Sequence, residues 1–432
     1  MKLLLIMADA RIHRLKIGPF ACSFREAPLT LTTLAAMIPK ELNIETELLD
    51  ESVQRIDFVK YHDFDLVGIS AITGTSLRAY DIADYFRSKS IPVVMGGVHV
   101  TIFPDEAQKH ADFIIAGFAE KTWPEFLKDF KEKKAKKRYV SAIDKMYLED
   151  IPIPRRDLQK KFGYMMPNTV MATRGCKNSC DFCTVPVICK GYHKRPIPDI
   201  IRDIRTIKAK RFTFNDVSIT EDPEYAKALF KEMIPLKKNW GGLSTFHVSK
   251  DKEMMELLEK SGCKYLLTGI ESVSQKTLRN IYKGFNKVDE YEEGMKKFHD
   301  AGILIQGCFI FGFDHDRDSV FEETVEQVNR LKVDIPRFAI YTPYPGTILF
   351  KRLEKENRIL TYDWSMYDTQ HVVYRPEHMS QRRLYEGFRW AYKETFKLRS
   401  IFERTLRAGK DFPITFLGNL AYKLYVKKLK QR

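Results

Sequence analysis

Three closely spaced cysteines are the residues of this chain whose types and spacing point most directly to chemistry. Cys176, Cys180 and Cys183 lie in the run TRGCKNSCDFCTVP, and this short loop holds no fourth cysteine. Three thiolates can bind three irons of a cubane iron–sulfur cluster and leave the fourth iron open to an external ligand. An electron-carrying cluster normally has four cysteines, and structural zinc has a closed tetrahedral set. The spacing CxxxCxxC therefore predicts a cluster at which a reaction takes place.

A zinc site is the alternative interpretation of these cysteines. It would need another ligand, for which Cys189 and His193 lie just downstream. The other cysteines, Cys22, Cys263 and Cys308, are scattered along the chain, so the sequence indicates no auxiliary cluster. Cysteines used in this way imply a reducing cytoplasm, where disulfides are disfavoured.

The residues around the cysteine loop resemble those of a known superfamily. Aromatic Phe182 precedes the third cysteine, and the apolar run Val170–Ala172 leads into the loop. With these flanks the loop resembles the CxxxCxφC signature of the radical S-adenosylmethionine (SAM) enzymes, in which φ is aromatic. The resemblance implies a [4Fe–4S] cluster with SAM chelating the open iron. It also implies that one electron cleaves SAM to a 5′-deoxyadenosyl radical, which abstracts hydrogen from unactivated carbon.

Between about residues 168 and 345, strand-like and helix-like segments alternate, which predicts parallel strands with crossover helices. The expected strands are Val170–Thr173, Arg211–Asn215, Leu243–Val248, Tyr265–Ile270, Leu304–Phe311 and Phe338–Tyr341. Six such units resemble the partial (β/α)6 barrel of the radical SAM family. In that barrel the cysteine loop follows the first strand, at the mouth where parallel-barrel active sites lie.

Several of these strand ends resemble SAM-binding segments of the family. FNDV ends the second strand, GIES ends the fourth, and QGCFIFG resembles the family's GxIxG strand. Glu271 could instead be a surface or helix-capping acid, and Ile310 would equally suit an ordinary core. No residue is assigned as catalytic. By the resemblance, the expected SAM contacts are Phe182, Asn215, Asp216, Glu271, Ser272 and Ile310.

The first 125 residues also alternate between strand-like and helix-like segments. Helical spacing is found, for example, at Leu29–Leu42 and Leu77–Ser88. The pattern predicts a Rossmann-like or flavodoxin-like parallel sheet, which binds ligands beyond the carboxyl ends of its strands. The expected strands are Leu3–Met7, Glu47–Asp50, Leu66–Ser70, Val93–Met95 and Phe113–Ile115.

Small residues at these strand ends resemble those of cobalamin-binding domains. Ser70–Ile72 followed by Gly96-Gly97 is similar to the SxL…GG pattern, and Gly117–Glu120 is similar to a GEGE-like loop. The DxHxxG motif, whose histidine binds cobalt in many cobalamin enzymes, is absent, and the first strand-end loop offers only His13. A domain that keeps the fold without the cofactor is the alternative. By the resemblance, the expected cobalamin contacts are Ser70, Thr73, Gly74, Gly96, Gly97, His99, Gly117 and Glu120.

The chain as a whole is expected to be an α/β protein of four segments. We expect a cobalamin-binding Rossmann-like domain at 1–126, a linker at 127–162, a radical SAM partial barrel at 163–346 and a helical C-terminal region at 347–432. A basic cluster at residues 131–138 and a proline-rich run at 151–156 indicate the linker.

Positive charge is concentrated at the C-terminal end. The formal net charge is +15, and from residue 382 onward fourteen Lys/Arg stand against four Asp/Glu. The excess indicates either a solvated basic face or an anionic partner. The tail is therefore interpreted as a helical cap over the barrel mouth or as an interfacial helix that attracts anionic lipid. Because no apolar run reaches ~18 residues, we expect a cytoplasmic protein, with the inner face of the membrane as a peripheral location.

Taken together, these resemblances imply a cobalamin-dependent radical SAM enzyme. We expect it to C-methylate an unactivated carbon of a small or lipid-like substrate through methylcobalamin and a 5′-deoxyadenosyl radical, with a reductant such as flavodoxin or ferredoxin. Rearrangement, cyclisation or oxidation without methyl transfer is the alternative. RNA modification, and with it a nucleic-acid partner, is disfavoured because that class is expected to carry N-terminal cysteines and a C-terminal barrel. Here the N-terminal part holds only Cys22, and the tail has helical spacing.

Overall fold

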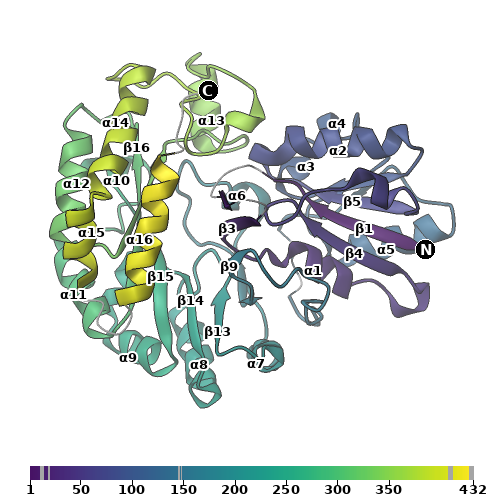
Figure 1. Ribbon diagram of the computed structural model, residues 1–432, viewed down its shortest axis with the longest axis horizontal. Coiled ribbons are helices and arrows are strands. Elements are labelled where there is room, and N and C mark those ends of the chain that lie inside the picture. The colour runs from purple at the N-terminus through teal and green to yellow at the C-terminus, as the bar shows by residue number, and fades with distance from the viewer. Residues whose placement is uncertain (10–13, 18–19, 145, 147, 407–411, 428–432) are drawn as a thin grey trace. The chain divides into compact units, whose positions relative to one another are not determined.

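The computed structural model describes residues 1–9, 14–17, 20–144, 146, 148–406 and 412–427 (Figure 1). His13 lies outside the described residues. By its internal contacts the chain forms two compact units. The first consists of Met1–Gly175, Thr184–Asp203 and Asp363–Asp368, and the second of Cys176–Cys183, Ile204–Tyr362 and Thr369–Arg432. The cysteine loop is thus part of the second unit.

The first unit is built on a six-stranded parallel sheet. Its strands follow the order β4-β1-β5-β6-β7-β8. Every neighbouring pair is parallel, as crossover helices require. The strands are β1 (Lys2–Met7), β4 (Glu45–Asp50), β5 (Leu66–Ser70), β6 (Val93–Gly96), β7 (Phe113–Ala116) and β8 (Arg138–Val140). The helices are α1 (Leu29–Ala36), α2 (Ser76–Ser88), α3 (Val98–Ile102), α4 (Pro104–Ala107) and α5 (Ala119–Lys131).

Helices cover both faces of this sheet, so its strands are buried on both sides. Leu4 and Ile6 of β1 belong to one apolar core together with residues of α2. Leu3 and Leu5 point to the opposite core, which is shared with α1 and α5. Because successive side chains of a strand alternate between faces, a strand buried twice is an unbroken apolar run. This is why the expected strands could be located from the sequence.

Two expectations about the first unit were wrong in detail. The helix expected at Leu29–Leu42 ends at Ala36, and only a 3-10 turn at Lys40–Leu42 follows. Pro39 explains the break, since proline lacks an N–H and disfavours helical backbone in the residue before it. The segment from residue 127 is not an irregular linker at its start. There α5 continues to Lys131, and β8 pairs with β7.

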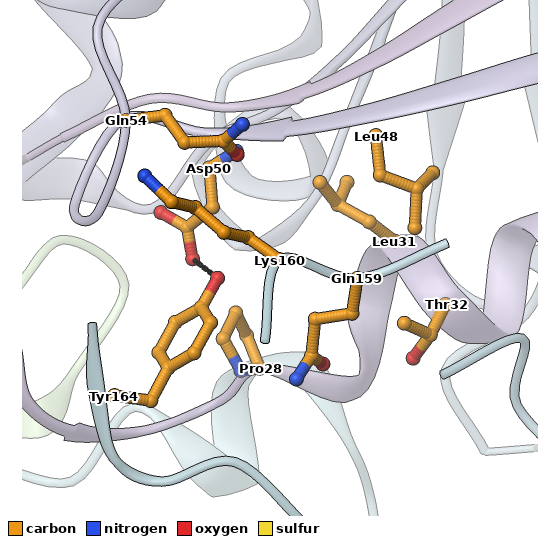
Figure 2. A pocket seen from close by; sticks show the side chains of 9 residues that line it. All are labelled: Pro28, Leu31, Thr32, Leu48, Asp50, Gln54, Gln159, Lys160 and Tyr164. Atoms are coloured by element: carbon orange, nitrogen blue, oxygen red, sulfur yellow. Dashed lines mark hydrogen bonds between the residues drawn. The ribbon is translucent and has the colours of Figure 1, made fainter. Parts of the chain in front are cut away.

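A small three-stranded sheet lies beside a pocket in the first unit. It contains β2 (Arg14–Ile17), β3 (Phe20–Glu26) and β9 (Tyr164–Met166), in the order β2-β3-β9. The Tyr164 hydroxyl donates a hydrogen bond of 2.9 Å to Asp50, at the end of β4 (Figure 2). Burial raises the pKa of Asp50, while hydrogen bonds from Ser52 and Tyr164 oppose this rise. The pocket lining comprises Pro28, Leu31, Thr32, Leu48, Asp50, Gln54, Gln159, Lys160 and Tyr164.

The second unit contains five parallel strands that follow one another in chain order. They are β13 (Arg211–Phe214), β14 (Asn239–Leu243), β15 (Cys263–Glu271), β16 (Leu304–Phe311) and β17 (Ile335–Ile340). The helices between them are α8 (Pro223–Met233), α9 (Lys252–Lys260), α10 (Gln275–Asn280), α11 (Tyr291–Asp300) and α12 (Val320–Arg330). The expected first strand is short, with β10 covering only Thr169–Val170. The chain then forms β11 (Thr173–Gly175), which pairs with β12 (Tyr192–Lys194), and continues through α6 (Val185–Ile188) and α7 (Ile197–Thr206). By its contacts, this stretch up to Asp203, apart from the cysteine loop, belongs to the first unit.

The strand expected at Leu243–Val248 was placed wrongly. The strand in this region is β14, which ends at Leu243, and Phe246–Lys250 forms the 3-10 helix η5. Two adjacent glycines hid β14 from the sequence pattern, since glycine is depleted in strands. A Cβ built on Gly241 would lie 3.0 Å from the ring of Tyr265 on the next strand, so the glycine permits this close packing. Phe246 instead packs its ring against Tyr291.

The C-terminal region is helical, as expected, and protects the edge strand β17. Its helices are α13 (Ile348–Lys355), α14 (Gln381–Thr395), α15 (Leu398–Thr405) and α16 (Phe412–Val426), with the 3-10 helix η7 (Trp364–Met366). Phe338 in β17 donates its N–H to the Tyr392 hydroxyl, which in turn donates to the Phe338 carbonyl. One side chain of α14 thus satisfies backbone groups that an edge strand would otherwise expose. Among the described residues, no helix has both the length and the apolar character needed to cross a bilayer.

Candidate functional site

The cysteine loop is held in the second unit by its central residue, Asp181. The Tyr341 hydroxyl, just beyond β17, donates a hydrogen bond to the Asp181 carboxylate. The Asp181 carbonyl accepts from the N–H of Leu349 in α13 at 2.9 Å, and the Asp181 N–H donates to the Ile281 carbonyl. The loop is therefore fixed at the ends of β17 and α10. None of the cysteines whose side chains are described is in a disulfide.

A carboxylate that the sequence did not single out lies close to the first cysteine. The Asn178 N–H approaches the sulfur of Cys176 at 3.4 Å. The Asn178 side chain donates a hydrogen bond of 2.6 Å to Glu221, in the loop after β13. Glu221 also acts electrostatically on the Cys176 thiol, whose pKa burial raises and Glu221 raises further. Only the fold brings Glu221 to this position.

A buried ion pair faces the other two cysteines. The Lys283 ammonium lies 2.6 Å from the Glu271 carboxylate, and the two side chains are only 12% and 9% exposed. Burial lowers the pKa of Lys283, but Glu271 and Cys180 outweigh this effect and raise it above its usual value. Glu271 has a φ of 64°, in the left-handed region that residues other than glycine rarely adopt. Strained backbone of this kind clusters at functional sites.

The electrostatics around the cysteines suit a bound cluster. Burial raises the pKa of the Cys180 thiol to about 12, and the positive charge of Lys283 counteracts this rise. Iron binding requires thiolates, so a neighbouring cation favours the bound form. Among the described residues, no three His, Cys, Asp or Glu side chains converge on a single-ion site. A cubane has a different requirement, because each thiolate binds its own iron. Three thiols on one anchored loop beside Lys283 fit that requirement.

The structure places the other expected SAM contacts at or near strand ends. Glu271 ends β15 and Ser272 follows it, and both residues are buried. Of the two, Glu271 lies within electrostatic range of the cysteines. Asp216 is buried and Asn215 is exposed, both just after β13. Ile310 is half-buried in β16, and the Phe182 ring lies 6.1 Å from that of Tyr341. The assignment of these six residues to SAM stays a prediction.

Three of the four glycines expected to bind cobalamin, Gly96, Gly97 and Gly117, lie at the carboxyl ends of β6 and β7, and Gly74 lies in the 3-10 helix η3 (Thr73–Thr75) after β5. Gly97 has φ 103° and ψ −174°, a conformation essentially confined to glycine. A Cβ there would lie 2.7 Å from the Ala71 carbonyl oxygen and 2.9 Å from the Ser70 hydroxyl. Thr101, which the sequence did not indicate, donates to the Gly97 carbonyl and accepts from the Gly117 N–H. The strand-end loops therefore form one connected backbone surface without side chains at the glycines, which fits a large ligand.

Two of the expected cobalamin contacts are occupied by bonds within the protein. His99 is fully buried, and its ring nitrogens contact Thr73 at 3.4 Å and Glu106 at 3.2 Å. Trp364 in η7 donates to the same Glu106 carboxylate at 3.4 Å. A Cβ on Gly74 would lie 3.0 Å from the carbonyl oxygen of Tyr367. Residues near position 365 therefore shape this corner of the first unit, which the sequence did not indicate.

Glu120 connects the expected cobalamin loop to the strand before the cysteines. Arg174 in β11 forms an ion pair with one Glu120 oxygen. The other oxygen, Oε2, is buried and makes no hydrogen bond to the described residues. The Arg174 guanidinium also lies 3.0 Å from the sulfur of Met171. A buried acceptor of this kind is compatible with a ligand that donates a hydrogen bond.

Comparison with known proteins agrees with this arrangement. Residues 170–328 match the family model of the radical SAM superfamily, and residues 23–127 match that of the B12 binding domain. The chain is 30% identical over 414 residues to bacteriochlorophyllide d C-12(1)-methyltransferase of Chlorobaculum tepidum, which covers 93% of this chain and 89% of the relative. It is 29% identical to bacteriochlorophyllide d C-8(2)-methyltransferase of the same organism, with 92% and 91% covered.

A solved structure shows the same fold. The chain superposes on the cobalamin-dependent SAM radical enzyme OxsB, solved with aqua-cobalamin and SAM bound, with a TM-score of 0.68. The match covers 97% of this chain and 72% of that chain at 14% identity. This confirms the expected fold class: an N-terminal cobalamin-binding Rossmann-like domain, a central radical SAM partial barrel and a helical C-terminal region. With a [4Fe–4S] cluster, SAM and cobalamin as its cofactors, the chain belongs to the methyltransferase-like family of cobalamin-dependent radical SAM enzymes.

Proposed function

We propose that this enzyme transfers a methyl group to an unactivated carbon of an apolar, ring-containing small molecule. The observation that carries the proposal is the 30% identity, along 93% of the chain, to a methyltransferase that acts on a bacteriochlorophyllide. A second relative, matched along 92% of the chain, acts on another carbon of the same pigment. Bacteriochlorophyllides are tetrapyrroles, so we place the substrate in the class of large, mostly apolar ring systems.

The chain's own residues would have distinct tasks in this reaction. When bound, the cluster and SAM supply a carbon radical that removes hydrogen, and cobalamin supplies the methyl group. Cys176, Cys180 and Cys183 would hold the cluster. Gly97 and Gly117 would shape the strand-end loops that hold cobalamin, because their positive φ and their close approach to Ala71 and Ser141 leave no room for a side chain.

We assign Lys283 to the carboxylate of SAM. Its ammonium lies within electrostatic range of Cys180 and Cys183, and Glu271 orients it from 2.6 Å away. A buried cation beside the cysteines would neutralise an acidic group that docks there, and charge-assisted hydrogen bonds are the strong ones. Glu221, on the other side of the loop, would accept from the SAM amino group.

Replacing Lys283 with glutamine is expected to weaken SAM binding by ~10- to 100-fold. A hydrogen bond to a charged group contributes about 1.5–3 kcal/mol, which corresponds to that range. Glutamine can still donate to Glu271 but carries no charge beside Cys180, so the iron content is measured in parallel and bound SAM is expressed per cluster. Equilibrium dialysis of SAM against the anaerobically reconstituted enzyme measures the effect. Lys250→Gln is the control, since Lys250 forms a half-exposed pair with Glu290 at the same 2.6 Å distance. Equal SAM affinity in both variants would contradict the assignment.

The products formed from SAM distinguish methyl transfer from rearrangement, cyclisation or oxidation. The reconstituted enzyme is incubated anaerobically with cobalamin, a reductant and methyl-labelled SAM, and the products are analysed by mass spectrometry. Methyl transfer predicts S-adenosylhomocysteine that forms only when cobalamin is present. Deoxyadenosine without S-adenosylhomocysteine would instead support rearrangement, cyclisation or oxidation.

A peripheral membrane contact is proposed for the C-terminal helices. Leu398 and Phe402 of α15 are exposed apolar side chains. The adjacent Lys397 and Arg399 pair with Glu394 and Glu403, but the chain from residue 382 onward has fourteen Lys/Arg against four Asp/Glu. Such a surface suits anionic headgroups. We expect the protein to float with vesicles that contain phosphatidylglycerol and to remain behind with phosphatidylcholine alone. If the protein floated with neither kind of vesicle, the proposed membrane contact would be contradicted.

A further inference from the structure

Three residues on neighbouring strands of the second unit form a row across its sheet. Gly269 in β15 is the pairing partner of Cys308 in β16, and Cys308 is the partner of Arg337 in β17. Residues paired directly across strands point to the same face of a sheet. The row therefore places a guanidinium group beside a thiol on one face.

This row lies on the more exposed face of the sheet. Along β17, Arg337 and Ala339 are half-buried, whereas Phe338 and Ile340 between and after them are buried. On the other face the sheet packs on helices, as shown by the Phe311 and Phe321 rings, 5.0 Å apart. The same alternation holds for Cys308 and Ile310 in β16. The half-buried face is thus the interior of the partial barrel.

The row begins beside the cysteine loop. The space where a Cβ of Gly269 would stand is filled by the carboxylate of Glu271 and the ammonium of Lys283. Lys283 in turn interacts with Cys180. From this end of the row, Arg337 is two strand spacings away, which is ~10 Å.

Arg337 has the chemistry of an acid-binding group. Burial alone would lower the pKa of its guanidinium, but Cys308 and the tyrosines of α14 and α16 raise it, so the group is charged. A planar guanidinium binds carboxylate and phosphate through two parallel hydrogen bonds. Tyr422 of α16 lies over the same face, where its hydroxyl accepts a 3.0 Å hydrogen bond from Gln306 of β16.

We propose that Arg337 binds an acidic oxygen group of the substrate, a carboxylate or a phosphate. The proposal rests on the proposed methyl transfer and narrows its substrate class to an apolar molecule that carries an acid group. The acid group at Arg337 fixes how far the rest of the molecule extends along the row toward Lys283. Arg337 thereby determines which carbon of the substrate is presented for reaction.

Cys308 provides a test that needs no knowledge of the substrate. The holoenzyme is treated with iodoacetate, which carries a carboxylate, or with neutral iodoacetamide, and the rates of alkylation at Cys308 are followed by peptide mass spectrometry. In both reactions a carbon–sulfur bond forms, iodide leaves, and the thiol proton goes to solvent. Because both reagents attack the same thiolate, the ratio of the two rates cancels any change in the Cys308 pKa. The ratio therefore measures how much the site favours the reagent that carries a carboxylate over the neutral reagent.

We expect the iodoacetate-to-iodoacetamide ratio at Cys308 to fall at least tenfold in Arg337→Gln and to be partly retained in Arg337→Lys. Arg382→Gln is the control, since this arginine is exposed on α14 and should leave the ratio unchanged. Butyrate and inorganic phosphate, compared at constant ionic strength, should protect Cys308 to different extents. The better protectant identifies the acid as carboxylate or phosphate.

An unchanged ratio in Arg337→Gln would overturn the proposal, as would protection by neither acid or absence of carboxymethylation at Cys308. These outcomes are distinct from failure of the proposed function. An enzyme that forms no S-adenosylhomocysteine could still show the alkylation preference. An enzyme that lacks the preference could still transfer methyl groups.

Discussion

Cys180→Ala is expected to lower reductive cleavage of SAM by at least about 1,000-fold, which corresponds to ~4 kcal/mol of lost transition-state stabilisation. With one of the three thiolates removed, the cluster has only two protein ligands, and alanine offers no substitute. The loop itself should keep its position, because Asp181 anchors it through Tyr341 and Leu349. Deoxyadenosine formed anaerobically by the reconstituted variant, together with its iron and sulfide content, measures the effect.

Cys263→Ala is the matched control for this experiment. Cys263 is fully buried in β15, away from the cysteine loop in sequence, and alanine leaves only a small cavity. We expect this variant to lose about 1 kcal/mol of stability at most and to keep its cluster. Full cleavage activity in Cys180→Ala, or loss of the cluster in Cys263→Ala, would contradict the assignment of the ligands.

Gly97→Val is expected to weaken cobalamin binding by at least ~100-fold while the cluster content stays the same. Two effects add at this position. The backbone conformation is one that residues other than glycine avoid, at a cost of about 1–3 kcal/mol. In addition, a Cβ would lie 2.7 Å from the Ala71 carbonyl oxygen, so the strand-end loop would have to shift. Cobalamin retained after gel filtration, read from its visible spectrum, measures the binding.

Gly302→Val separates the local effect from general strain. Gly302 also has a positive φ, of 67°, but a Cβ there would have no heavy atom within 4 Å, and the residue lies in the second unit. Both variants should lose stability, which thermal unfolding records, whereas only Gly97→Val should lose cobalamin. If the two variants retained cobalamin equally, the loop of Gly97 would not be part of the binding site.

Local patterns explain what the sequence could predict. The cysteine motif can be recognised in the sequence because its three residues lie within eight positions. The strands of the first unit can be recognised because burial on both faces makes them unbroken apolar runs. The same logic explains the error at β14. Two glycines removed the apolar signal there, and the apolar run that follows forms η5.

Long-range contacts explain what the sequence could not predict. Lys283 lies a hundred residues beyond Cys183, and only the pairing and turns of the second unit bring it to the cysteine loop. Glu221 reaches Cys176 through Asn178 in the same way. By the resemblance, His99 was expected to contact cobalamin, and its ring contacts Glu106, which also accepts from Trp364 of a distant segment. Side-chain pairing of this kind has no signature in local spacing.

The central claim is that the cysteine loop leaves one iron of the cluster free for SAM. Electron–nuclear double resonance on the reduced holoenzyme, with SAM labelled by nitrogen-15 at its amino group and oxygen-17 at its carboxylate, tests it most directly. We predict hyperfine coupling of both labels to the cluster, lost in Cys180→Ala. A cluster in wild-type enzyme that shows no coupling to either label, because a fourth protein side chain occupies that iron, would contradict the account.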